Sequence, residues 1–154
     1  MLGAIRPDSI NLDVVVHVLG AMVLVGGVVT AATAAVVGWR DERDALLRLS
    51  YRTLLAVALP GWIVMRIGAQ WAYSKEHLDD LPDDPGWIGI GFITADLGGL
   101  LLLIALVLGG IGVYRAKGAE REGGGGLLKA SGVLAVVLVA IYVIAVWAMA
   151  GKPD

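Results

Sequence analysis

Residues 59–71, Leu59-Pro-Gly-Trp-Ile-Val-Met-Arg-Ile-Gly-Ala-Gln-Trp71, form an apolar stretch that carries a single charge, the guanidinium of Arg66. The stretch is typical of a membrane-spanning helix, and Pro60 predicts a kink in it. An unpaired arginine or aspartate near the centre of such a helix costs roughly 2.5–3.5 kcal/mol. We therefore expect Arg66 to have a partner within a helix bundle. Asp96, in another apolar run, is the counter-charge that we expect.

Composition indicates a membrane protein. The 154 residues are 58% hydrophobic and only 17% charged, whereas a soluble domain has about 25% charged residues. The mean hydropathy of +0.80 points the same way. One domain over residues 1–154 is sufficient at this length. The net charge of −2 gives no sign of a nucleic-acid partner, and the lack of cysteine excludes disulfides and thiolate metal sites.

Four apolar runs predict an all-α fold, a polytopic four-transmembrane-helix bundle in a lipid bilayer. We expect the helices at about residues 13–38, 50–73, 87–114 and 127–150. The uncharged run from Val14 to Trp39 is too long for the apolar core of a signal peptide, so we expect it to span the membrane. The connections are charged, then acidic with prolines, then basic and glycine-rich, which predicts a flexible turn for the third.

The distribution of lysine and arginine predicts the orientation. The first and third connections, with the adjoining helix ends, hold Arg40, Arg43, Arg48, Arg52, Arg115, Lys117, Arg121 and Lys129. The opposite side holds Arg6, Lys75 and Lys152. The positive-inside rule therefore predicts that both termini lie on the outer side of the cell membrane.

Polar side chains within the predicted helices fall in one half of the bundle. Counting about 1.5 Å of rise per residue from each boundary, all four helices contribute to the outer leaflet: Asp13, His17, Arg66, Gln70, Asp96 and Tyr142. The inner half carries little beyond threonines. We therefore predict an outer-leaflet polar cluster formed by these residues.

Two interpretations of the cluster are open. In the first, Arg66 and Asp96 form a structural ion pair between the second and third helices, with Gln70 and Tyr142 satisfying the remaining hydrogen bonds. In the second, the cluster is a pocket open to the outer face that binds an anionic or redox-active ligand, with His17 as ligand or proton carrier. Intramembrane ionisable residues are candidates for functional sites in general.

His17 is the candidate metal or haem ligand, with a simple packing role as the alternative. Ligation of haem b by two histidines would need His77, in the acidic connection, or His17 of a second copy, whereas five-coordinate haem needs only His17. The sequence contains no serine–histidine–acid arrangement, phosphate-binding glycine loop or zinc motif. We therefore assign no catalytic residue and do not expect an enzyme.

Small residues in the first predicted helix indicate a packing face. Gly27, Ala31 and Ala35 recur at a spacing of four, the pattern that lets two helix backbones approach closely in lipid. We expect this stripe to pack against another helix, either within the chain or in a homo-oligomer or another membrane-protein partner.

Two passages resemble known membrane proteins. Residues 17–27, His-Val-Leu-Gly-Ala-Met-Val-Leu-Val-Gly-Gly, are similar to the first helix of the copper-resistance D family and of HemJ-type protoporphyrinogen oxidases. That resemblance implies a role for His17 as a haem or metal ligand. The set Trp87-Ile-Gly-Ile-Gly, Asp96-Leu-Gly and Ala145-Val-Trp-Ala-Met-Ala-Gly-Lys-Pro153 resembles four-helix integral membrane proteins of actinobacterial type, which implies the same fold and no particular activity.

Together these patterns predict a multi-pass membrane protein whose outer-leaflet cluster binds or passes a small ligand or ion. The alternatives are a haem-binding membrane redox protein that uses His17 and a structural accessory subunit of a membrane complex.

Overall fold

A computed structural model describes residues 12–75, 86–117 and 124–151 of the chain. Within these ranges the protein is helical and contains no β-strand, which confirms the all-α prediction. Four helices are long and apolar enough to cross a membrane: Leu12–Arg40, Asp44–Lys75, Ile88–Ala116 and Gly124–Gly151. Large aliphatic side chains are exposed along all four. Such helices are apolar on their outer as well as their inner sides, as expected of a bundle with lipid as its solvent.

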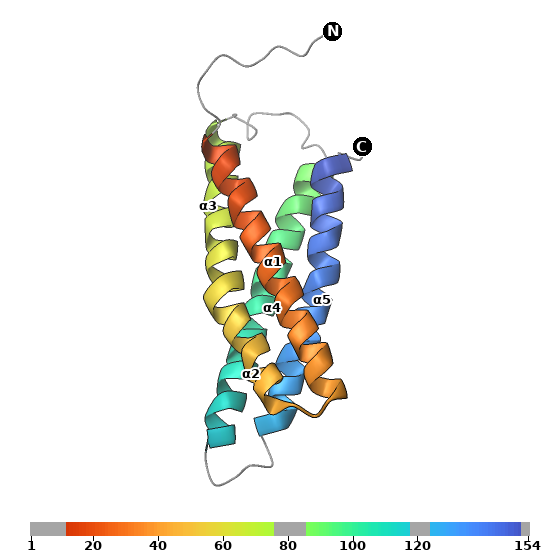
Figure 1. Ribbon diagram of the computed structural model, residues 1–154. Coiled ribbons are helices and arrows are strands. Elements are labelled where there is room, and N and C mark those ends of the chain that lie inside the picture. Colours follow the sequence, from red (N-terminus) through yellow and green to blue (C-terminus); the bar gives the residue numbers. More distant parts are fainter. Residues whose placement is uncertain (1–11, 76–85, 118–123, 152–154) are drawn as a thin grey trace.

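The elements run alternately up and down the bundle (Figure 1). They are α1 (Leu12–Arg40), α2 (Asp44–Thr53), the π-helical turn η1 (Leu54–Ala58), α3 (Leu59–Lys75), α4 (Gly86–Lys117) and α5 (Gly124–Gly151). Leu12, Lys75, Gly86 and Gly151 lie at one end, which we call the Leu12 end. Arg40, Asp44, Lys117 and Gly124 lie at the other, the Arg40 end.

The second membrane helix begins at Asp44, six residues before the expected start at residue 50. Charged residues lower the hydropathy of this first turn, but Leu47 is buried and packs against Gly38 of α1. The turn between the helices is tight because the Arg43 N–H donates to the Gly38 carbonyl, with Glu42 at φ 53° between them. This is the geometry of a helix C-terminus closed by a left-handed residue.

Pro60 accounts for the π-helical turn that precedes α3. A proline has no N–H and its ring crowds the carbonyl four residues back. Here the N–H of Leu59 donates to the Leu54 carbonyl, five residues back, so the helix widens locally over Leu54–Ala58. The kink predicted at Pro60 thus takes the form of a π-turn, a common way for a helix to absorb such a break.

The third connection differs from the flexible turn expected at its glycines. Gly124 begins α5, and a Cβ at this position would lie 2.8 Å from the Gly112 carbonyl oxygen of α4. The glycine therefore allows α4 and α5 to touch at the Arg40 end. Residues 118–123 lie outside the described part of the chain.

The small-residue stripe of α1 packs within the chain. Gly27, Ala31 and Ala35 are all buried. A Cβ on Gly27 would lie 2.9 Å from the Ala58 nitrogen, and Ala35 is the nearest neighbour of Gly132 on α5. The stripe is therefore a packing face, but it is covered by this chain's own helices and is not free to hold a second copy.

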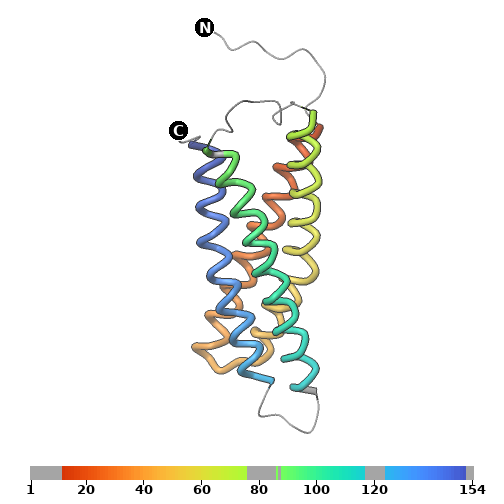
Figure 2. Tube along the Cα trace, turned by 180° about the vertical axis from the view of Figure 1, so that it is seen from behind, coloured from red at the N-terminus to blue at the C-terminus, as the bar shows by residue number. Residues whose placement is uncertain are grey.

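The bundle consists of two helix pairs that join at the Arg40 end. Glycines at α1–α3 contacts bring those two helices together along their length, and α4 packs along α5 in the same way. Ala35 and Trp39 of α1 meet Gly132 of α5 near the Arg40 end. Toward the Leu12 end the pairs spread apart, as Figures 1 and 2 show from opposite sides. That spreading makes room for a cavity.

Candidate functional site

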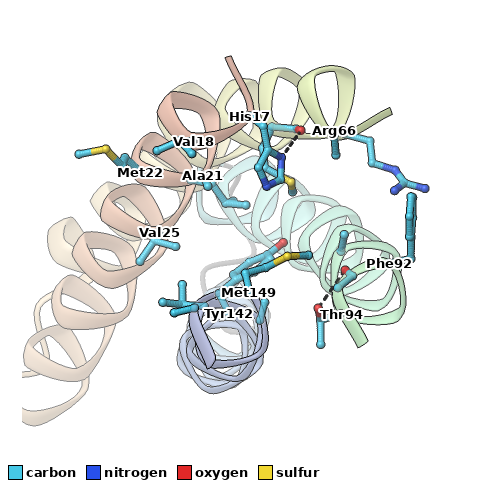
Figure 3. A pocket seen from close by; sticks show the side chains of 18 residues that line it. His17, Val18, Ala21, Met22, Val25, Arg66, Phe92, Thr94, Tyr142 and Met149 are labelled. Carbon is cyan, nitrogen blue, oxygen red and sulfur yellow. Dashed lines mark hydrogen bonds between the residues drawn. The ribbon is translucent and has the colours of Figure 1, made fainter. Parts of the chain in front are cut away.

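A cavity of about 760 Å³ lies between the two helix pairs in the half of the bundle nearer the Leu12 end (Figure 3). All four long helices line it, and most of the lining residues are apolar: valine, leucine, alanine, methionine, glycine and phenylalanine. The polar side chains of the lining are His17, Arg66, Thr94 and Tyr142. Volume and lining fall within the usual range of sites for small molecules.

The cavity exists because each helix places a small residue toward the bundle axis at this level. These residues are Ala21 of α1, Ala69 of α3, Gly91 of α4 and Ala145 of α5. Leu24 and Tyr142 lie at the deep end, where the core of the bundle begins. The space is therefore a product of residue size rather than of a missing helix.

The opening of the cavity faces the side of the bundle between α1 and α5. The lining residues that are exposed all belong to these two helices: Val18, Met22, Val146, Met149 and Ala150. Met22, which is 66% exposed, lies ten residues along α1 from Leu12, a rise of about 15 Å. The opening is thus lateral and extends well below the Leu12 end.

His17 is held by the backbone of α3. Its Nδ1 atom lies 3.0 Å from the Met65 carbonyl oxygen. A carbonyl only accepts, so we assign the proton to Nδ1, which leaves Nε2 with a free lone pair. The contact is possible because Gly68 has no side chain: a Cβ there would collide with the backbone nitrogen of His17. Figure 3 shows the imidazole turned into the space between the helices.

Tyr142 brings a second polar group into the cavity. The residue is 4% exposed and packs against Gly98 of α4, where a Cβ would lie 2.7 Å from the phenolic oxygen. That hydroxyl is buried and has no hydrogen-bond partner in the described part of the chain. A buried polar group without a partner is unusual in a native protein. Tyr142 lines the cavity, so a molecule bound there is a candidate partner for the hydroxyl.

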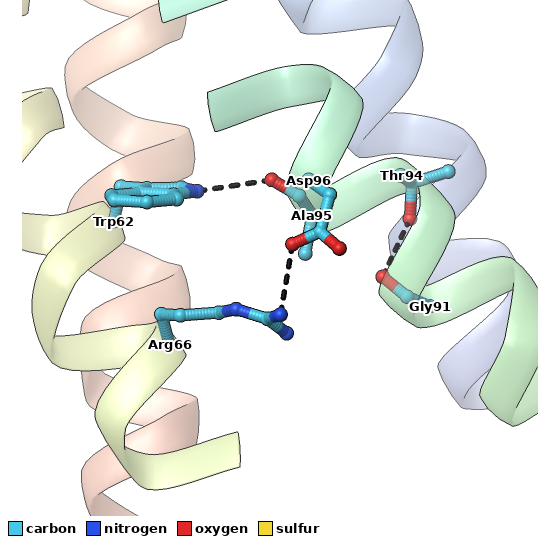
Figure 4. A network of polar contacts seen from close by, with 6 residues as sticks. All are labelled: Trp62, Arg66, Gly91, Thr94, Ala95 and Asp96. Atoms are coloured by element: carbon cyan, nitrogen blue, oxygen red, sulfur yellow. Dashed lines mark hydrogen bonds and ion pairs between the residues drawn. The ribbon is translucent and has the colours of Figure 1, made fainter. Parts of the chain in front are cut away.

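Arg66 and Asp96 form the expected ion pair, at 2.8 Å between Nη2 and Oδ1. The guanidinium also lies 4.9 Å from the centre of the Phe92 ring, and Phe92 meets Tyr73 edge to face. One turn deeper, the Trp62 indole donates to the Ala95 carbonyl at 3.0 Å (Figure 4). These contacts close the side of the cavity between α3 and α4.

The sequence predicts that the pair lies in the interior of the bundle, and the structure instead places it at the surface. Its side chains are 28% and 61% exposed for Arg66 and Asp96. In Figure 3 the guanidinium points away from the cavity toward Phe92. Arg66 is among the lining residues of the cavity, whereas Asp96 is not. The helical phase of Asp96 turns its carboxylate past the α3–α4 contact to the outer surface.

Asp13 and Gln70 also lie apart from the cavity. Asp13 is 1% exposed and accepts a hydrogen bond from Lys75 Nζ at 2.9 Å, at the Leu12 end. Gln70 is exposed and makes no hydrogen bond to the described residues. The predicted cluster is therefore divided into three sites: His17 with Tyr142 inside, Arg66 with Asp96 outside, and Asp13 with Lys75 at the end.

Sequence reasoning missed two contributors to this region. Lys75 pairs with Asp13 because α1 begins where the antiparallel α3 ends. The predicted helix boundaries could have indicated this pair. Thr94 is buried in the lining, but its hydroxyl donates to the Ile90 and Gly91 carbonyls of its own helix. It is therefore already satisfied.

The described residues contain no group of three or more His, Asp or Glu side chains that could hold a metal ion. His77 and the acidic connection lie outside the described residues, so a His17–His77 pair is not tested. No family model matches the chain, and no curated protein or solved structure is significantly similar to it. The cavity is therefore the feature of this protein that points to a function.

Proposed function

We propose that this chain is a multi-pass membrane protein of the cell membrane that binds a small lipophilic molecule in the cavity between α1, α3, α4 and α5. The main support for this proposal is an apolar cavity that opens laterally and is lined by two hydrogen-bonding side chains, His17 and Tyr142. In a bilayer, an opening between α1 and α5 faces the acyl chains. A ligand dissolved in the membrane would enter there without crossing water.

The two polar groups define the chemistry of the ligand's polar head. The Tyr142 hydroxyl can donate and accept, and Nε2 of His17 can accept. A ligand hydroxyl could donate to Nε2 and accept from Tyr142, and a ligand carbonyl could accept from Tyr142 alone. We therefore propose a lipophile with a hydroxyl or carbonyl head, such as a phenol or a quinone.

Passage of an ion is less well supported by this geometry. The polar atoms of the lining are few and do not form a continuous row between the two ends of the bundle. At the deep end the core closes with Leu24, Leu102, Leu138 and other fully buried aliphatic residues. The basic residues of the Arg40 end support an orientation with that end inside the cell, and we propose on this basis that the cavity lies in the outer leaflet.

A comparison of two probes of equal size tests the proposal. Naphthol carries a hydroxyl group where methylnaphthalene carries a methyl group. The binding of each would be measured on protein in lipid nanodiscs, and the signal from nanodiscs without protein would be subtracted. We expect saturable binding of both, with naphthol tighter by about tenfold because one good hydrogen bond contributes about 1.4 kcal/mol. Binding indistinguishable from that of empty nanodiscs would refute the proposal.

A haem protein is the second candidate, and one observation favours it. A histidine whose Nδ1–H is held by a backbone carbonyl presents Nε2 as a metal ligand in a fixed orientation, and His17 meets this description. His17 is the one histidine of the cavity lining and would be the axial ligand of a haem bound there. The guanidinium of Arg66 points away from the cavity, so it would not meet the haem carboxylates. A Soret band in the purified protein that is lost in His17→Asn would support this candidate over the first.

A further inference from the structure

The surface where α3 meets α4 carries polar groups that the described residues leave unsatisfied. Asp96 gives one carboxylate oxygen to Arg66, and no described residue pairs with the other. Gln70 follows Arg66 by one helical turn and exposes its amide on the same side of α3. Both side chains are exposed, and neither is among the residues that line the cavity and its opening between α1 and α5.

These groups are surrounded by aliphatic side chains. Ile63 precedes Arg66 by three residues, and Ile93 and Leu100 flank Asp96 by three and four, so each shares a helix face with the pair. All three are exposed. We call this set, with Arg66, Gln70 and Asp96, the α3–α4 face. In acyl chains an exposed carboxylate at this depth is costly, whereas a second protein surface with a matching charge would stabilise it.

The two charges lie at nearly the same depth. Arg66 lies nine residues before the end of α3 at Lys75, and Asp96 lies ten residues after the start of α4 at Gly86. At about 1.5 Å per residue these distances are roughly 14 and 15 Å. α3 ends and α4 begins at the Leu12 end of the bundle, so the positive and negative groups lie side by side in the plane of the membrane.

We propose that the α3–α4 face binds a second copy of this chain, related by a twofold axis along the membrane normal. Such an axis preserves depth and exchanges left with right, so Arg66 of each copy faces Asp96 of the other. The two pairs then form one closed network of four charges, and the free carboxylate oxygen of each Asp96 gains a guanidinium. A face with one positive and one negative group at equal depth is complementary to itself, as a twofold interface requires. The interface does not use the exposed residues of α1 and α5 at the opening of the cavity.

Cysteine cross-linking tests the interface directly, because the natural chain has no cysteine. One tagged chain would carry Ile63→Cys and a differently tagged chain Leu100→Cys, with both reconstituted at low density in liposomes and oxidised. The twofold arrangement brings α3 of one copy beside α4 of the other, so we expect a mixed cross-linked dimer. Ile63→Cys paired with Val143→Cys, an exposed position on α5, is the matched control and should give only background.

A second variant shows whether the charges hold the dimer. Adding Arg66→Leu and Asp96→Leu to both cysteine chains removes the network without leaving an unpaired charge, and far-UV circular dichroism would verify the helix content. We expect the mixed cross-link to fall about fivefold or more, in line with the free energy of polar contacts between membrane helices. A cross-link no stronger than the Val143→Cys control, or one that the double leucine variant leaves unchanged, would overturn the proposal.

Discussion

Nδ1 of His17 on α1 lies 3.0 Å from the Met65 carbonyl oxygen on α3, so a side chain of one helix is fixed by the backbone of its neighbour. The bond has two consequences. It joins two antiparallel helices near the Leu12 end, and it sets the imidazole so that its other nitrogen, Nε2, is free to meet a ligand. Substitutions at His17 can therefore distinguish the structural role of Nδ1 from the ligand-binding role of Nε2.

His17→Asn and His17→Leu should differ from each other in stability, whereas both should impair ligand binding in the same way. The asparagine amide can reach the position of Nδ1 and donate to the Met65 carbonyl, but it offers nothing at the position of Nε2. We expect His17→Asn to unfold near the wild-type denaturant concentration, and His17→Leu to lose about 1 kcal/mol. Both should lose part of the preference for naphthol over methylnaphthalene. Equal stability of the two variants would argue against the bond to Met65.

Gly68→Ala should destabilise the protein by about 1–3 kcal/mol, because overpacking a close helix contact forces the backbones apart. The new methyl group would collide with the backbone of His17. Gly26→Ala is the matched control, since a Cβ at that position meets no atom within 4 Å. Unfolding in detergent followed by circular dichroism would distinguish the two, and a loss of similar size in both would contradict the close α1–α3 packing.

Arg66→Leu alone should be strongly destabilising, by roughly 2–3 kcal/mol, because it leaves Asp96 without a counter-charge at a depth where water is scarce. Adding Asp96→Leu should restore most of the lost stability. The coupling free energy from this double-mutant cycle, measured by unfolding in detergent, reports the pair directly. If the two losses simply add, the ion pair does not contribute as the structure indicates.

Tyr142→Phe should leave stability unchanged or slightly higher, because the phenolic hydroxyl has no partner in the described residues and its removal leaves no other group unsatisfied. The same change should weaken naphthol binding by about fivefold, equivalent to a hydrogen bond of about 1 kcal/mol. Methylnaphthalene serves as the internal control, and its affinity should not change. A marked loss of stability would show that the hydroxyl has a structural partner instead.

Much of the fold could be predicted because it depends on the length and hydropathy of four segments. The pairing of Arg66 with Asp96 was predictable for a similar reason, since each lies within an apolar run and few charges are available. The early start at Asp44 was not, because there a charged amphipathic turn packs through Leu47 and looks like a loop in hydropathy. The depth of a residue along its helix also does not predict whether its side chain faces the interior or the surface of the bundle.

The candidate site shows this limit most clearly. Depth correctly placed His17, Arg66, Asp96 and Tyr142 in the same half of the bundle, yet it could not say which faced inward. That depends on the rotation of each helix about its axis, which is set by glycine contacts such as Gly68 with His17 and Gly98 with Tyr142. The cavity itself arises from alanines and glycines, which carry no chemical signature in the sequence.

Filling the cavity tests the central claim most directly. Ala145 lines the cavity, whereas Ala140 is exposed on the same helix and does not line it. Binding of naphthol in nanodiscs would be measured for the wild type, Ala145→Phe and the control Ala140→Phe. A lipophile bound between the helix pairs predicts at least about tenfold weaker binding in Ala145→Phe alone, because the ring occupies the ligand's space. Wild-type affinity in Ala145→Phe, or an equal loss in both variants, would contradict the account.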